Sequence, residues 1–211
     1  MRLVPFLAIA AAAVCALWAP GVLAQQARPP AARELSPAEL VAELRRGNDI
    51  VYFRHTATDH AQSDADMKSY EDCAHQRNLI DRGRRDAQLI GAWIRALSIP
   101  IGKILASPHC RTVETAGLAF GRFEKTNEAR YRMGAAGEEE RYAELRRLLA
   151  TRPAPGTNTV IVGHGSPIQK IAGLNLGEGD IEVIRPLGNR FELLGRIRVQ
   201  DWAALGPAAR K

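Results

Sequence analysis

Residues 159–167 of this 211-residue chain read TVIVGHGSP, and they decide the fold class. The stretch begins with four β-branched residues, three of them apolar, which is typical of a strand that is covered on both faces. The Ser-Pro pair at 166–167 is typical of a helix start. A polar Gly-His-Gly sequence therefore lies at the corner between a buried strand and a helix.

Two earlier segments repeat this arrangement. Residues 50–56 read IVYFRHT and residues 103–111 read KILASPHCR, so each short apolar strand ends in polar residues. The alternation of strands with amphipathic segments predicts an α/β protein, a three-layer α/β/α sandwich with a mostly parallel sheet. Helices are expected at 36–46, 81–97, 107–119, 138–150 and from 166, and a hairpin at 181–184 and 191–197.

Capping residues set the predicted helix starts. Ser36 and Glu39 fit a capping box in front of the first helix. Asp81 is placed to cap the second helix, and Ser107 and Ser166 each precede a proline in the same way as Ser36.

The first 24 residues predict a secretory signal peptide. One arginine precedes a long apolar run that ends in Val-Leu-Ala, with cleavage expected after Ala24. We therefore expect a periplasmic or secreted protein with a signal peptide at 1–24, a flexible lead-in at 25–35 and one domain at 36–211. A membrane anchor is the alternative, but the run is short for a span and no basic cluster follows it.

The composition limits the classes of binding partner that can be expected. The formal net charge is +6, yet no block of Lys and Arg with interleaved aromatic residues occurs, so nucleic acid is not expected. A modest positive charge suits small anionic ligands. Cys73 and Cys110 remain after cleavage, and in an oxidising compartment they either form a disulfide or stay two separate thiols. Their spacing does not fit a zinc site.

The polar groups at the three strand ends are expected to share one crevice, because ligands of such sheets bind at the carboxyl ends of the strands. Arg54 and Arg111 offer forks that match phosphate oxygens. His55 and His164 offer imidazoles that can act as nucleophile or hydrogen-bond donor. Ser107 is a further candidate phosphate contact.

These motifs resemble those of the histidine phosphatase superfamily, which has the phosphoglycerate-mutase-like fold. Arg54-His55-Thr56 resembles its Arg-His-Gly motif, and Gly163-His164-Gly165 its second histidine motif. Residues 107–116 are similar to its second arginine motif, and 79–88 to its usual helix start. The likeness spans 49–186, and among bacterial members it favours exported ones such as the lipopolysaccharide-core heptose phosphatases.

The resemblance implies a role for each residue. His55 would attack phosphorus and become phosphohistidine, Arg54 and Arg111 would clamp the phosphoryl oxygens, and His164 would stabilise the developing charge. No cofactor or metal is implied. The expected partner is a small phosphorylated substrate, with an envelope sugar phosphate as one candidate, and the oligomeric state is not predicted.

Two features depart from the family pattern. Thr56 replaces the usual glycine, which alters the backbone beside the nucleophile or adds a hydroxyl contact. The acid that protonates the leaving oxygen is not identified by any motif. The candidates are Glu138, Glu139, Glu140, Glu178 and Asp180, although the first three also fit the acidic first turn of a helix.

Two other functions remain open from the sequence. The missing acid keeps a non-catalytic phosphate-binding or anion-binding module on the same fold as the main alternative. A mutase is discounted, since a pool of phosphorylated sugar acids is not expected outside the cytoplasm. Asp59, Asp64 and Asp66 in the long polar loop are interpreted as solvated charges, with a part in repelling or selecting substrate as the alternative. The other three histidines are interpreted as loop residues, and for one of them, His109, a contact to the substrate or to a site residue is the alternative.

Overall fold

The computed structural model describes residues 33–130, 134 and 136–205. The predicted signal peptide and all but the end of the predicted lead-in lie outside the described residues. Within the described part, none of the helices has the length and apolar character that a bilayer span requires.

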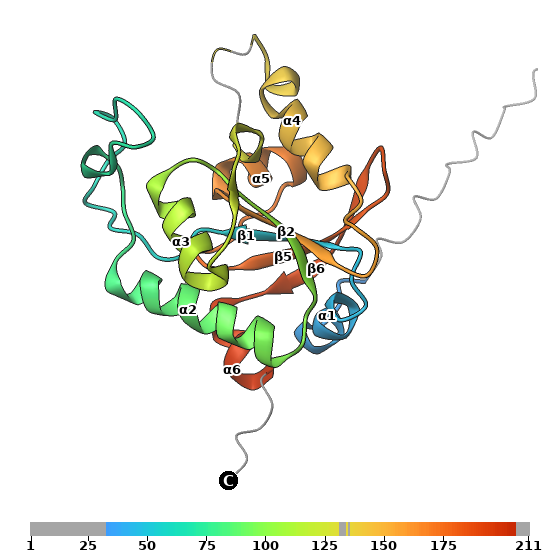
Figure 1. Ribbon diagram of the computed structural model, residues 1–211. Helices are drawn as coiled ribbons and strands as arrows, with labels where there is room; N and C mark the ends of the chain where they lie inside the picture. The colour runs from blue at the N-terminus through green and yellow to red at the C-terminus, as the bar shows by residue number, and fades with distance from the viewer. Residues whose placement is uncertain (1–32, 131–133, 135, 206–211) are drawn as a thin grey trace, which may run out of the picture. The chain divides into compact units, whose positions relative to one another are not determined.

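A six-stranded sheet forms the centre of the domain (Figure 1). Its strands lie in the order β3-β2-β4-β1-β5-β6. Three neighbouring pairs are parallel and two are antiparallel, so the sheet is mostly parallel as predicted. The bounds are Ile50–Arg54 for β1, Ile101–Ala106 for β2, Glu124–Lys125 for β3, Asn158–Gly163 for β4, Ile181–Pro186 for β5 and Phe191–Ile197 for β6.

Helices cover both faces of this sheet. Leu40, Ile90 and Trp202 come from one side and form a buried cluster with the inward residues of β1, β4 and β6. Leu145 and Ile168 come from the other side and pack on the opposite face of the same strands. The helices of the first side are α1 (Pro37–Leu44), α2 (Asp81–Ala96), α3 (Cys110–Phe120) and α6 (Trp202–Leu205), and those of the second are α4 (Glu138–Ala150) and α5 (Gly165–Ala172). The predicted three layers are confirmed.

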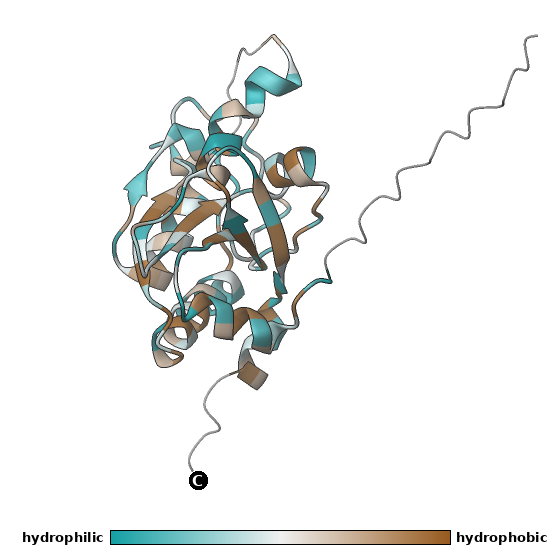
Figure 2. Cartoon of the chain, turned by 90° about the vertical axis from the view of Figure 1, so that its right-hand side faces the viewer, coloured by the Kyte–Doolittle hydropathy of each residue, from teal (hydrophilic) through white to brown (hydrophobic). Residues whose placement is uncertain are grey.

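The distribution of hydropathy agrees with these layers. Figure 2 shows brown, apolar residues along the central strands and teal, polar residues on the outer turns of the helices. The predicted inward stripe of α2 is buried, because Ala87, Ile90, Ile94 and Leu97 are each at most 3% exposed. Burial of such side chains is the main favourable term for folding.

Three of the predicted N-caps are wrong. Only the Ser36–Glu39 capping box forms as expected. Helix α2 begins at 81 as predicted, but Asp81 is its first residue and no side chain caps it. Helices α3 and α5 begin after His109 and His164, so neither Ser107 nor Ser166 is an N-cap.

Candidate active site

A cavity of about 440 Å³ opens at the carboxyl ends of β1, β2 and β4, which are neighbours in the sheet. Arg54 is the last residue of β1 and His55 follows it, while His164 follows β4. Arg111 lies in the first turn of α3, one connection after β2. All four line the cavity, so residues that are far apart in the sequence meet as the strand ends predict.

His55 is held as a neutral imidazole. Its side chain is buried, and its Nδ1 lies 3.0 Å from the Thr56 carbonyl oxygen. Because a carbonyl can only accept, Nδ1 carries the proton and Nε2 keeps a free lone pair. Burial, assisted by the charges of Arg111 and Arg54, lowers the pKa of His55 to about 3 against the opposing effect of the Thr56 contact. This protonation state is the one that a nucleophile requires.

His164 is fixed at both its ring and its backbone. Its ring centroid lies 5.6 Å from that of His55. Its Nε2 is 2.8 Å from the Ser107 hydroxyl. The Tyr52 hydroxyl accepts the His164 amide at 3.1 Å and donates to the His164 carbonyl at 2.8 Å. Burial and the nearby Arg111 lower the pKa of His164.

The buried hydroxyl of Ser107 contacts the rings of two histidines. Besides His164, it lies 3.2 Å from Nδ1 of His109. His109 itself lines the cavity, with its ring 4.6 Å from that of His164 and 5.0 Å from that of Tyr70. Ser107 is not part of the cavity wall, and its hydroxyl orients the two rings.

Three guanidinium groups surround the cavity. Arg54 contacts the Leu176 carbonyl and lies 3.6 Å from a Glu178 oxygen. Arg111 forms a two-point ion pair with Asp64, at 3.0 Å for each nitrogen–oxygen pair. The third, Arg77, was not predicted from the sequence. Each of the three has a buried Nε that meets no acceptor among the described residues. Such unpaired donors are suited to an anionic ligand.

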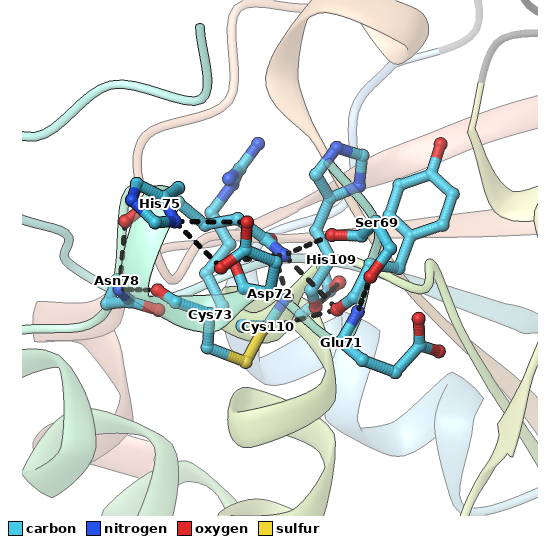
Figure 3. The surroundings of a disulfide bond; sticks show 12 residues. Ser69, Glu71, Asp72, Cys73, His75, Asn78, His109 and Cys110 are labelled. Atoms are coloured by element: carbon cyan, nitrogen blue, oxygen red, sulfur yellow. Dashed lines mark hydrogen bonds and ion pairs between the residues drawn. A yellow bond between two sulfur atoms is a disulfide. The ribbon is translucent and has the colours of Figure 1, made fainter. Parts of the chain in front are cut away.

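A disulfide holds the long connection between β1 and α2 against the site. Cys73 and Cys110 are bonded, with their Cα atoms 5.7 Å apart (Figure 3). Next to the bridge, the Gln76 side chain accepts the Cys110 amide at 3.0 Å. The loop brings Asp64 into the cavity wall, so the interpretation of Asp64 as a solvated loop charge is wrong. The signal for this residue was weak, since the loop has no periodic pattern.

The Thr56 hydroxyl forms a buried contact within the protein. Its side chain is fully buried, and its amide and hydroxyl each lie 3.3 Å from the Thr115 hydroxyl of α3. Thr115 in turn donates to the Arg111 carbonyl at 2.7 Å. Thr56, where the resembled motif has glycine, therefore connects the end of β1 to the helix that carries Arg111.

The two glycines beside His164 make room for protein groups. A Cβ on Gly163 would lie 2.4 Å from the Tyr52 hydroxyl, and a Cβ on Gly165 would lie 3.2 Å from the Arg54 guanidinium. The small residues thus allow Tyr52 to reach the His164 backbone and Arg54 to lie against the start of α5.

The predicted acid candidates are not part of the cavity wall. Glu138 extends to Lys170 at 3.1 Å, Glu139 to Arg146 at 3.8 Å, and the Glu140 carboxylate accepts the Ala136 amide at 3.2 Å. They occupy the first turn of α4, as the alternative interpretation had it.

Glu178 lies closer to the site. Its carboxylate accepts the Thr58 hydroxyl at 2.6 Å and the Thr58 amide at 3.1 Å. Burial alone would raise the pKa of Glu178, but these hydrogen bonds and the charge of Arg54 lower it overall. The Asp180 carboxylate accepts the Gly177 amide at 2.9 Å.

Comparisons with known proteins establish the fold. No family profile and no curated protein matches the sequence. Among solved structures, the mycobacterial glucosyl-3-phosphoglycerate phosphatase Rv2419c with inorganic phosphate has a TM-score of 0.53 and 14% identity, over 73% of this chain and 99% of that one. A candidate phosphohistidine phosphatase SixA from Nakamurella multipartitia has a TM-score of 0.51 and 19% identity, over 72% and 95%.

These neighbours are histidine phosphatase superfamily members. The chain has the phosphoglycerate-mutase-like fold that they share, as the sequence motifs predicted.

Proposed function

We propose that this protein is a phosphatase that hydrolyses phosphomonoesters through a phosphohistidine on His55. One observation carries the proposal: two neutral imidazoles, 5.6 Å apart, face one cavity between the guanidinium groups of Arg54 and Arg111. Phosphoryl transfer requires mainly positioning and stabilisation of charge, and these groups supply both.

The reaction would proceed in two displacements. Nε2 of His55 attacks phosphorus, the bond to the leaving oxygen breaks, and that oxygen takes up a proton. Water then attacks phosphorus from the opposite side, the phosphorus–nitrogen bond breaks, and inorganic phosphate leaves with His55 regenerated. Arg54, Arg111 and His164 hold the phosphoryl oxygens in both steps.

The proposed mechanism needs no metal. Positive charge that a metal would supply to the phosphoryl group comes from the two guanidinium forks and from the N-terminus of α5. Helix α5 begins directly after His164, and its first residues, Gly165 and Ser166, line the cavity.

We further propose that the substrate is small and that the protein acts outside the cytoplasm. A cavity of about 440 Å³ fits a small phosphorylated molecule. The apolar leader at 1–24 supports export, and an exported enzyme of this kind would act on an envelope sugar phosphate, as the resemblance to heptose phosphatases suggests. A structural neighbour named for glucosyl-3-phosphoglycerate is compatible with a sugar phosphate substrate.

The test is hydrolysis of p-nitrophenyl phosphate with EDTA present. Wild-type turnover should fall to the background rate in His55→Ala, and rapid quenching should trap an acid-labile phosphoprotein only in the wild type. His75→Ala is the matched control, since this histidine is about half exposed and pairs with Asp72 outside the cavity. Stabilisation by phosphate without turnover would indicate the binding module instead, and loss of activity on chelation would contradict a metal-free mechanism.

A further inference from the structure

Asp64 is the only carboxylate that lines the cavity among the residues that the structure describes. Its two oxygens meet two nitrogens of Arg111, and Oδ1 also accepts the Arg77 amide at 2.8 Å. The residue lies on the loop that the disulfide anchors to α3. The carboxylate is therefore held at the cavity wall by the fold.

The exposures of Asp64 and His55 place them at different depths. His55 is 1% exposed and forms part of the cavity floor. The Asp64 side chain is 33% exposed, so it lies nearer the solvent. In an in-line displacement the leaving oxygen departs on the side of phosphorus opposite the nucleophile. With His55 on the floor, that side faces the opening, where Asp64 is.

Glu178 does not line the cavity, although its carboxylate lies 3.6 Å from a nitrogen of Arg54. Both of its oxygens accept hydrogen bonds from Thr58, one from the hydroxyl at 2.6 Å and the other from the amide at 3.1 Å. These contacts hold the Glu178 carboxylate outside the cavity wall, so among the described residues Asp64 is the carboxylate placed to face a bound phosphoryl group.

We propose that Asp64 is the acid that protonates the leaving oxygen, an inference that rests on the phosphatase reaction proposed above. As the bond between phosphorus and the leaving oxygen breaks, the Asp64 carboxyl gives its proton to that oxygen. In the second step the Asp64 carboxylate takes a proton from the attacking water while the phosphorus–nitrogen bond breaks. The proton balance closes, and Asp64 is ready for the next substrate.

Substrate binding favours the protonated form of the Asp64 carboxyl. In the free protein, burial raises the pKa of Asp64, but the Arg77 amide and Arg111 outweigh it and keep the group ionised. A phosphoryl group that binds Arg111 adds negative charge and draws that guanidinium away from Asp64. Both changes favour protonation of the carboxyl. A phosphomonoester monoanion, whose last proton has a pKa of about 6, brings a proton with it.

The test is the dependence of rate on the leaving group. Asp64→Asn is assayed on p-nitrophenyl phosphate, whose leaving group needs no proton, and on phenyl and glycerol phosphates, whose leaving groups do. We expect kcat to fall about 100-fold or more for the poor leaving groups and only a few-fold for p-nitrophenyl phosphate. Asp64→Glu should restore part of the lost rate. Asp66→Asn, an exposed change of the same charge on the same loop, should alter neither rate.

The outcomes separate this inference from the proposed function. An equal fall for all leaving groups would show that Asp64 only orients Arg111 and would overturn its role as the acid. Tighter phosphate binding with an unchanged leaving-group dependence would show a simple counter-ion and would also overturn it. Absence of His55-dependent turnover in the wild type would instead overturn the phosphatase proposal itself, and this inference with it.

Discussion

Tyr52 is the residue on which the position of His164 most depends. Its side chain is fully buried under the site, and its hydroxyl satisfies both the amide and the carbonyl of His164. Such a hydroxyl is worth more than an ordinary contact, because its removal leaves two buried backbone groups unpaired. It acts through another residue, so it is a positioning residue.

Tyr52→Phe should therefore lower kcat about tenfold and reduce the free energy of unfolding by about 1–3 kcal/mol. The KM should change little, since the phosphate clamps are untouched. Tyr142→Phe, a buried tyrosine on α4 outside the cavity, is the control for the kinetic effect. Phosphatase kinetics and urea unfolding check both variants, and a change in KM alone would contradict the positioning role.

Arg77 is the third cation of the cavity wall. Burial lowers the pKa values of Arg54 and Arg111, and the charge of Arg77 lowers them further. The buried Nε of Arg77 meets no acceptor in the described part of the chain. Arg77→Gln should weaken binding of inorganic phosphate about tenfold, as expected for loss of one charge-assisted hydrogen bond. Calorimetric titration measures the affinity. Arg82→Gln, a change on an exposed side chain of α2, should leave it unaltered.

The sequence predicts some site residues and not others for a physical reason. Arg54 and His55 follow a strand directly, so the strand fixes where they lie. Asp64 and Arg77 belong to a loop without periodicity, whose path depends on the Cys73–Cys110 bond and on contacts with α3. No local pattern carries that information, which is why only the first pair could be identified from the chain alone.

At the scale of elements, Ser-Pro pairs show the limit of capping rules. Ser36 caps α1, since its hydroxyl accepts the Glu39 amide and donates to the Glu39 carboxylate. Ser107 is followed by the same kind of proline, yet its hydroxyl binds His164, and α3 starts two residues past Pro108. The long strands and the three-layer arrangement were predicted well, because continuous apolar runs fit few structures other than a buried strand. The two-residue β3 and the four-residue α6 were not predicted, because such short elements have no periodicity to detect.

Strand β5 carries a buried carboxyl that makes stability depend on pH. Glu182 is 2% exposed; burial, with Glu34 and Asp180 nearby, raises its pKa to about 7 against the effect of Arg196. A carboxyl whose folded pKa exceeds its unfolded value favours folding at low pH, and this contribution is lost as pH rises through the folded pKa.

Glu182→Gln should remove that loss. Relative to the wild type, the variant should gain about 1–2 kcal/mol of unfolding free energy between pH 5 and pH 8, after allowance for screening by solvent. Urea unfolding at the two pH values measures the difference. Glu192→Gln changes an exposed carboxyl on the neighbouring strand β6 and should show no such gain. An equal effect of both variants would assign the pH dependence to net charge.

At the scale of the whole molecule, the disulfide closes a long section of the chain. Cys73 and Cys110 are 37 residues apart, and the enclosed section contains α2 and β2. Replacing both cysteines by alanine should lower the free energy of unfolding by about 4 kcal/mol on the chain-entropy model. Reduction of the wild type should produce the same shift in the urea midpoint, and a shift well below 1 kcal/mol would show that packing alone holds the loop.

Strand β4 is the last of the three site-bearing strands in the chain, and it inserts between β2 and β1. Strands β1 and β2 do not pair with each other. Only when β4, at residues 158–163, pairs with both of them do the two imidazoles come to face each other. Assembly of the cavity is thus tied to a late stretch of the polypeptide. A ribosome-bound or truncated chain that ends before this strand contains His55, Arg54 and Arg111 and still lacks the assembled cavity, so recovery of the proposed activity during refolding would report completion of the sheet.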